Sequence, residues 1–197
     1  DLGQEVDDVL GAAVELGVAL LPAEALDLGH GQAGDADLRE RFAHLVADFC
    51  AFTERCAGEH PATPVFMLGH SMGGAVAFAS ALRLQHMLRG LVLSAPALAT
   101  DQSVPRLQEL FVRLLSVVAP GTGALTLPAD AVSRDPSVVA RYAADPLVHH
   151  KAIPARTLVE LLGAMQGFPA SASSLRVPTL VLHGTADQLV PLAANRR

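Results

Sequence analysis

A serine set between two glycines carries the strongest chemical signature in this sequence. Gly69-His70-Ser71-Met72-Gly73 fits the G-x-S-x-G pattern of a nucleophile elbow, a sharp turn from a strand into a helix. The strand and the helix crowd each other around such a serine, so we expect that only glycine fits at Gly69 and Gly73. The N-terminus of the helix directs free N–H groups at the same point. These features predict Ser71 as a nucleophile.

The flanking segments agree with this interpretation. Residues 65–68 are continuously apolar, as expected of a strand covered on both faces, and Gly74-Ala75 continue into a helix of small residues over about 72–86. The alternative interpretation is a glycine-rich strand–helix turn that carries a solvated serine.

A serine nucleophile needs a base, and none of the eight histidines is a convincing one. His70 adjoins Ser71, so its side chain should point away from the hydroxyl. His183 directly follows a strand and should support the next loop, and His30 should bond backbone in a loop at the active edge of the sheet. The other histidines are placed on helices, on loops and in an inserted segment: His44, His60, His86, His149 and His150.

The two cysteines, Cys50 and Cys56, lie six apart in one predicted helix. This spacing places them too far around the helix to bridge readily, so two free thiols are expected. No Cys/His spacing matches a zinc pattern, and neither a metal nor an organic cofactor is expected.

The elements that must position Ser71 alternate between helix and strand. Hydrophobic spacing predicts helices over 5–16, 37–57 and 72–86, and strands over about 23–28, 65–68, 91–93 and 177–182. Such alternation predicts an α/β fold with a mostly parallel sheet covered by helices.

The alternation stops from about 98 to 166, where the sequence shows no convincing strand. Helices are predicted near 104–118, 136–144 and 154–165. A helical insertion between two strands of a parallel sheet should form a cap over the carboxyl edge of the sheet, where ligands bind in open α/β folds. We therefore predict a core of residues 1–97 and 167–197 and a cap of residues 98–166.

The composition of the chain restricts the classes of partner that are expected. The chain has 197 residues, enough for one domain, and a net charge of −6 with no basic run, which argues against nucleic acid. No apolar run reaches transmembrane length and no signal peptide is visible, so a cytoplasmic location is expected.

Several segments resemble the α/β-hydrolase superfamily, and within it the bacterial type of the monoacylglycerol lipase and lysophospholipase branch. They are Gly69-His70-Ser71-Met72-Gly73-Gly74, Leu91-Val92-Leu93-Ser94-Ala95-Pro96 and residues 183–191, HGTADQLVP. Residues 26–32, LDLGHGQ, match the G-H-G segment of the branch, and residues 130–136 and 144–150 resemble the cap of bacterial members. The resemblance covers essentially the whole chain.

This resemblance implies Ser71 as the nucleophile and Asp187 as the acid of a catalytic triad. It implies the backbone N–H of Met72 as one oxyanion donor, and Leu2, in a candidate remnant of the family's H-G-x-G-E segment, as the other. Four residues of the helix at 104–118 either line an acyl channel or only pack the cap on the core: Leu107, Leu110, Phe111 and Leu114.

The chain also departs from the family pattern. The strands that precede the H-G segment are absent, as are the last strand, the last helix and the triad histidine, which the resemblance places beyond Arg197. Terminal strands of the fold are therefore expected to be missing. Either the sequence covers part of a protein, or it is a truncated and inactive homologue.

The predicted function is hydrolysis of carboxylic esters of lipid-like substrates by a serine hydrolase, with monoacylglycerols as the predicted substrates. A broad esterase or thioesterase of the same fold and a catalytically dead lipid-binding homologue are the alternatives. The expected partners are a small lipid ester and, through the cap, peripheral contact with a membrane; the oligomeric state stays open.

Overall fold

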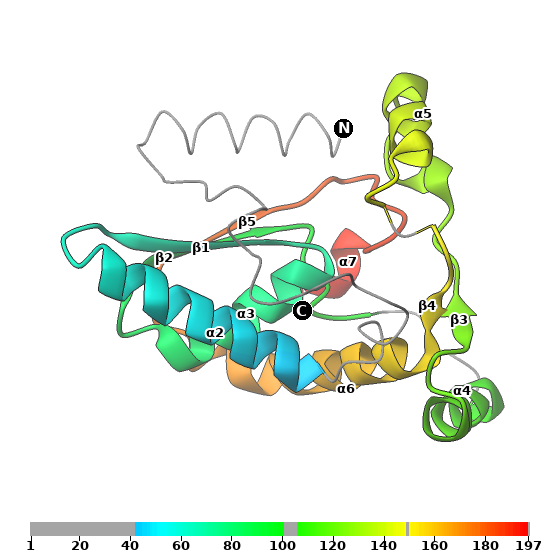
Figure 1. Cartoon of the computed structure of the whole chain (residues 1–197), viewed down its shortest axis with the longest axis horizontal. Coiled ribbons are helices and arrows are strands. Elements are labelled where there is room, and N and C mark those ends of the chain that lie inside the picture. Colours follow the sequence, from blue (N-terminus) through cyan, green and yellow to red (C-terminus); the bar gives the residue numbers. More distant parts are fainter. Residues whose placement is uncertain (1–41, 101–105, 149, 197) are drawn as a thin grey trace.

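The computed structural model of the protein describes residues 42–100, 106–148 and 150–196 (Figure 1). The predicted helix over 5–16, the strand over 23–28, Leu2, His30 and His149 lie outside these ranges. The backbone of Leu107 is described but its side chain is not.

A three-stranded parallel sheet forms the centre of the structure. Its strands are β1 (Val65–His70), β2 (Leu88–Ser94) and β5 (Thr179–Leu182), in the order β1-β2-β5. His70 pairs with Ser94, and Ser94 pairs with Leu182, so the three strands end at the same level. The loops that follow them therefore leave one edge of the sheet together, as the alternating sequence pattern predicted.

Three helices pack on one face of this sheet: α2 (Phe42–Glu59), α3 (Met72–Leu84) and α6 (Ala155–Ala172) (Figure 1). The core between them and the sheet is apolar, with Met67, Leu91 and Leu93 each at most 2% exposed. Phe168 of α6 meets Phe78 of α3 edge to face, with 5.1 Å between ring centroids. Cys50 and Cys56 on α2 are both free, as predicted.

The opposite face of the sheet is open among the described residues. Phe66 is 51% exposed although its neighbour Met67 is 2% exposed, and Leu68 and Leu180, on the same face as Phe66, are 40% and 54% exposed. The expectation that β1 is covered on both faces is thus wrong for the described part of the chain, because all the helices described against the sheet pack on the Met67 side.

The inserted segment was predicted to be helical throughout, but the structure shows that it also contains two short strands. It contains α4 (Arg106–Val118), the 3₁₀ turn η3 (Ala129–Ala131) and α5 (Pro136–Ala144), but also β3 (Gly123–Leu125) and β4 (Ile153–Pro154), which pair antiparallel. These strands have three and two residues, too few to produce a period of two in the sequence. Asp135 caps α5 by accepting a hydrogen bond from the N–H of Ser137 at 2.8 Å.

Helix α6 continues to Ala172, seven residues past its predicted end at 165. The extension includes Gly167 and Pro169, although glycine and proline disfavour helix interiors. Burial of Met165 and Phe168 against the core outweighs this preference. One continuous helix therefore runs across the predicted boundary between cap and core, and α4 also packs on it.

None of the helices in the described ranges combines the length and the apolar character needed to cross a membrane.

Candidate active site

Ser71 has the strained backbone conformation expected of an elbow. It lies between β1 and α3 with φ 52° and ψ −121°, a region that a non-glycine residue adopts only when its surroundings hold it there. The N–H of Ser71 donates to the carbonyl of Ser94 at 3.0 Å, and the carbonyl of Ser71 accepts from the N–H of Ala97 at 2.9 Å. These two bonds tie the turn to the loop after β2.

The glycines around Ser71 differ in their importance. A Cβ at position 69 would lie 2.3 Å from the carbonyl oxygen of Gly73 and 2.7 Å from the Cβ of Ala77, so glycine is required there. A Cβ at position 73 would meet nothing within 4 Å, and the prediction for Gly73 is wrong. The carbonyl of Gly73, not its Cα hydrogens, faces the strand. Gly74 is the second tight position, since a Cβ there would lie 2.7 Å from the Cβ of Pro96.

The structure brings Ser71 and Asp187 to the same pocket. Both follow strands that end at one sheet edge, Ser71 after β1 and Asp187 in the loop after β5. The pocket is lined by His70, Ser71, Ala95, Val132, Asp187, Leu189 and Val190. A hydroxyl and a carboxylate that are distant in sequence thus share one concave site.

The side chain of Asp187 is 2% exposed and is held by its own loop. Its Oδ1 accepts hydrogen bonds from the N–H groups of Leu189 and Val190, both at 2.9 Å. Its Oδ2 lies 3.5 Å from Nε2 of His183. The buried carboxylate is therefore satisfied by backbone donors and has a defined orientation before any substrate binds.

The two histidines nearest the site are both engaged elsewhere. His70 Nδ1 lies 3.2 Å from Ser94 Oγ. Desolvation by burial lowers the pKa of His70, although a hydrogen bond with the backbone of Ser94 and the charge of Asp187 oppose this shift. His183 Nε2 donates to the carbonyl of Val190 at 2.7 Å. In the described part of the chain no histidine hydrogen-bonds the Ser71 hydroxyl.

Met72 opens α3 directly after Ser71, so its backbone N–H has no partner within the helix. This position suits a donor to a developing oxyanion beside Ser71. Leu2, the predicted second donor, lies outside the described residues.

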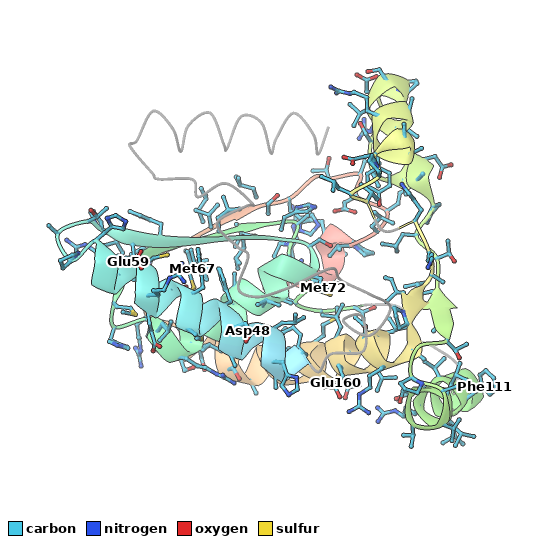
Figure 2. All side chains as sticks on the ribbon, in the orientation of Figure 1. Asp48, Glu59, Met67, Met72, Phe111 and Glu160 are labelled. Carbon is cyan, nitrogen blue, oxygen red and sulfur yellow. The ribbon has the colours of Figure 1, made fainter. Side chains whose placement is uncertain are left out.

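Three of the predicted acyl-channel residues of α4, all with described side chains, do not line this pocket. Leu110, Phe111 and Leu114 are 64%, 62% and 59% exposed. In Figure 2, Phe111 lies on α4 well apart from Met72 at the start of α3. The inserted segment instead contributes Val132, which directly follows η3.

Sequence reasoning missed Val132, Leu189 and Val190 as lining residues. The available signal was their place within the two segments whose resemblance was noted, 130–136 and 183–191.

Comparison with protein families and curated sequences gives consistent matches. The family model Hydrolase_4, described as "Serine aminopeptidase, S33", matches residues 25–197. The chain is 41% identical over 186 residues to the "Monoacylglycerol lipase" of Mycolicibacterium smegmatis, an alignment that covers 93% of this chain and 66% of that protein. It is 31% identical over 180 residues to the "Monoglyceride lipase" of Homo sapiens, covering 90% of this chain and 59% of that protein. The chain thus spans less than two thirds of the length of these relatives.

Comparison with solved structures also gives matches to monoacylglycerol lipases. The crystal structure of the Paleococcus ferrophilus monoacylglycerol lipase matches with a TM-score of 0.64 and 28% identity, covering 77% of this chain and 58% of that one. A soluble variant of the monoglyceride lipase from Saccharomyces cerevisiae, solved in complex with a substrate analog, matches with a TM-score of 0.60 and 21% identity, covering 74% and 52%.

Proposed function

Because the chain belongs to the Hydrolase_4 family and has the α/β-hydrolase fold, we propose that it is a serine hydrolase of lipid-like carboxylic esters, with monoacylglycerols as substrates. The observation that carries this proposal is the position of Ser71, on a strained turn and in one pocket with Asp187. The relative from Mycolicibacterium smegmatis, a monoacylglycerol lipase by name, supports the substrate class.

In the proposed mechanism Ser71 Oγ attacks the ester carbonyl carbon and passes its proton to a histidine base. The N–H of Met72, with a second N–H near Leu2, stabilises the oxyanion; losing one such donor typically slows turnover by about 10²–10³-fold. The tetrahedral intermediate then expels the alcohol, which takes the proton from the base. Water, deprotonated by the same base, hydrolyses the acyl-Ser71 ester.

Asp187 supports this chemistry through the base. Its carboxylate accepts a hydrogen bond from the imidazole, fixes the tautomer and stabilises the imidazolium that forms. The proposal takes the base from a histidine that follows Arg197 in the full-length protein, as the family resemblance implies. The engagement of His70 with Ser94 and of His183 with Val190 supports this choice.

Peripheral contact with a lipid surface is a further part of the proposal. The exposed side chains of α4 form one apolar stripe, with members at Leu110, Phe111, Leu114, Val117 and Val118. Such a stripe on an amphipathic helix suits the boundary between headgroups and acyl chains.

An activity-based probe tests the nucleophile. A fluorophosphonate should label the full-length protein and not Ser71→Ala, and the exposed Ser174→Ala should label like the wild type. The wild-type protein should hydrolyse medium- and long-chain monoacylglycerols faster than acetate esters or acyl thioesters. Equal labelling of Ser71→Ala would refute the assignment of the nucleophile, and a preference for thioesters would favour a thioesterase. A wild type that neither labels nor turns over would indicate the dead lipid-binding homologue.

A further inference from the structure

Two polar side chains outside the proposed catalytic set connect the acid loop to the nucleophile turn. His183 directly follows β5, and Asn195 ends the short helix α7 (Leu192–Asn195). The side chain of His183 is 3% exposed. Its Nε2 lies 2.7 Å from the carbonyl oxygen of Val190 and 3.5 Å from Asp187 Oδ2. His183 therefore contacts both the carboxylate and the loop that carries it.

The contacts of His183 define its tautomer. The carbonyl of Val190 can only accept, so Nε2 carries the proton and Nδ1 of a neutral ring is an acceptor. Asn195 Nδ2 lies 3.4 Å from that Nδ1. The amide orientation has an independent determinant, because Asn195 Nδ2 also donates to the carbonyl of Pro96 at 2.6 Å. A single amide NH₂ group thus contacts both the His183 ring and the loop after β2.

Pro96 belongs to the loop that holds the nucleophile. The next residue, Ala97, donates its N–H to the carbonyl of Ser71 at 2.9 Å. Pro96 also packs against the first turn of α3, where its Cβ lies 2.7 Å from the position that a Cβ on Gly74 would take. Contacts consequently run without interruption from Asp187 through His183 and Asn195 to the turn that bears Ser71.

The other end of the Asn195 amide is unfavourably placed. Asn195 Oδ1 is buried and accepts no hydrogen bond within the described part of the chain. A buried acceptor without a partner costs stability, whereas an apolar side chain of similar size would not. The donor end of the amide accounts for this residue better than space filling does.

We propose that His183 and Asn195 are positioning residues that hold the Asp187 carboxylate at a fixed place relative to Ser71. His183 donates Nε2–H to the carbonyl of Val190, and the N–H of Val190 donates to Asp187 Oδ1, so the ring holds the acid loop in the conformation that fixes the carboxylate. Asn195 holds His183 and ties the acid loop to Pro96. The inference rests on the proposed function, since it takes Asp187 as the acid that orients the base.

Substitution of each residue in the full-length protein is the first test, assayed on a soluble short-chain ester. His183→Leu and Asn195→Leu should each lower kcat by about 10- to 100-fold, because small misplacements of catalytic groups have effects of this size, with KM changed less than kcat. His183→Gln should recover much of the loss, since its amide N–H can replace Nε2–H. The exposed His44→Leu on α2 is the matched control and should behave as the wild type. Thermal melting curves establish that each variant is folded.

A double-mutant cycle separates positioning from packing. Asp187→Asn alone should lower kcat by about 10⁴-fold, the loss that triad enzymes show when the acid is made neutral. If His183 and Asn195 act through Asp187, adding His183→Leu or Asn195→Leu to Asp187→Asn should cause little further loss. Multiplying losses would overturn the proposal, as would near-wild-type kcat in both leucine variants. If His183→Leu does not fold, the Asn195→Leu cycle and the activity of His183→Gln decide.

The cycle also distinguishes a failure of the proposed function from a failure of the positioning role alone. Wild-type turnover by Asp187→Asn would remove the acid from the proposed function, and the inference would fall with it. An inactive Asp187→Asn together with fully active leucine variants would leave the proposed function intact and refute only the positioning role.

Discussion

Ser71 and Ala95 are the two non-glycine residues with positive φ in the described part of the chain, at 52° and 40°. Each directly follows a strand, at the same edge of the sheet, and both line the pocket. Ala95 is held by an N–H bond to the carbonyl of Leu182 at 2.8 Å, and Ser71 by its bond to Ser94. Strained residues cluster where a fold must fix a group for chemistry, and this cluster agrees with the proposed site.

The elbow yields a prediction about two glycines of the same motif. Gly69→Ala should lower the free energy of unfolding by about 1–3 kcal/mol or more, because its Cβ would overlap backbone atoms of Gly73 and cannot be relieved by a rotamer change. Gly73→Ala, in the first turn of α3, meets open space and should be neutral or stabilising by up to about 1 kcal/mol. Chemical denaturation of both variants measures the difference.

The two substitutions should change the free energy of unfolding to clearly different extents, with the larger loss in Gly69→Ala. If Gly73→Ala destabilises the protein as much as Gly69→Ala does, then the crowding is symmetric about Ser71 and the described geometry of the turn is wrong.

At the scale of elements, helix α4 carries an apolar stripe that is exposed. It packs on α6, and Glu109 and Arg113 form an exposed ion pair of 2.8 Å on its surface. Its stripe from Leu110 to Val118 contacts no described partner large enough to bury it, with Val117 72% and Val118 69% exposed. An exposed stripe of this size is more typical of a contact surface than of an acyl channel.

The proposed contact between α4 and lipid predicts that activity depends on how the substrate is presented, in a membrane or in solution. Phe111→Asp should lower turnover of long-chain monoacylglycerols embedded in phosphatidylcholine vesicles more than turnover of a soluble short-chain ester, because a carboxylate opposes insertion into lipid. Replacing Val117 and Val118 together by Gln should reduce cosedimentation with the same vesicles. Gln is a good helix former, so α4 should persist.

The matched control is Arg113→Gln, which changes the polar surface of the same helix without touching the stripe. A uniform loss of turnover across chain lengths in Phe111→Asp, with unchanged cosedimentation of the double valine variant, would show that the stripe packs against protein.

At the scale of the whole molecule, the described structure is one-sided. All the helices described against the sheet lie on one face, and β2 is the strand with partners on both edges (Figure 1). Leu91 and Leu93 on β2 are each 1% exposed, whereas α5 has no buried residue. Stability should therefore fall from the β2 core toward the outer part of the inserted segment.

Amide hydrogen exchange can measure this gradient. The amides of β2 should exchange only through global unfolding, which costs about 5–15 kcal/mol in typical domains, and those of α5 through cheaper local opening. α6 should be more protected around Met165 and Phe168 than at its first turn. Protection of α5 equal to that of β2 would instead mean that the inserted segment unfolds together with the core.

Local sequence was sufficient to predict the three strands of the parallel sheet and the elbow. The apolar run after Pro64, the glycine at 69 and the small residues of α3 act within a few positions of one another, so their effect is readable without the fold. Parallel strands also followed from the alternation of helix and strand, and α5 was predicted at its observed bounds, 136–144. Asp187 was identified from the family resemblance, and its place beside Ser71 agrees with the common strand ends.

Only the tertiary structure decided which residues meet across long stretches of chain. The carbonyl of Pro96 meets Asn195, Val132 reaches the pocket of Ser71, and β3 pairs with β4, although no periodic pattern links these segments. The different roles of Gly73 and Gly74 likewise depend on where Pro96 lies. Contacts of this kind arise from packing between elements, and packing depends on three-dimensional positions that a one-dimensional pattern does not contain.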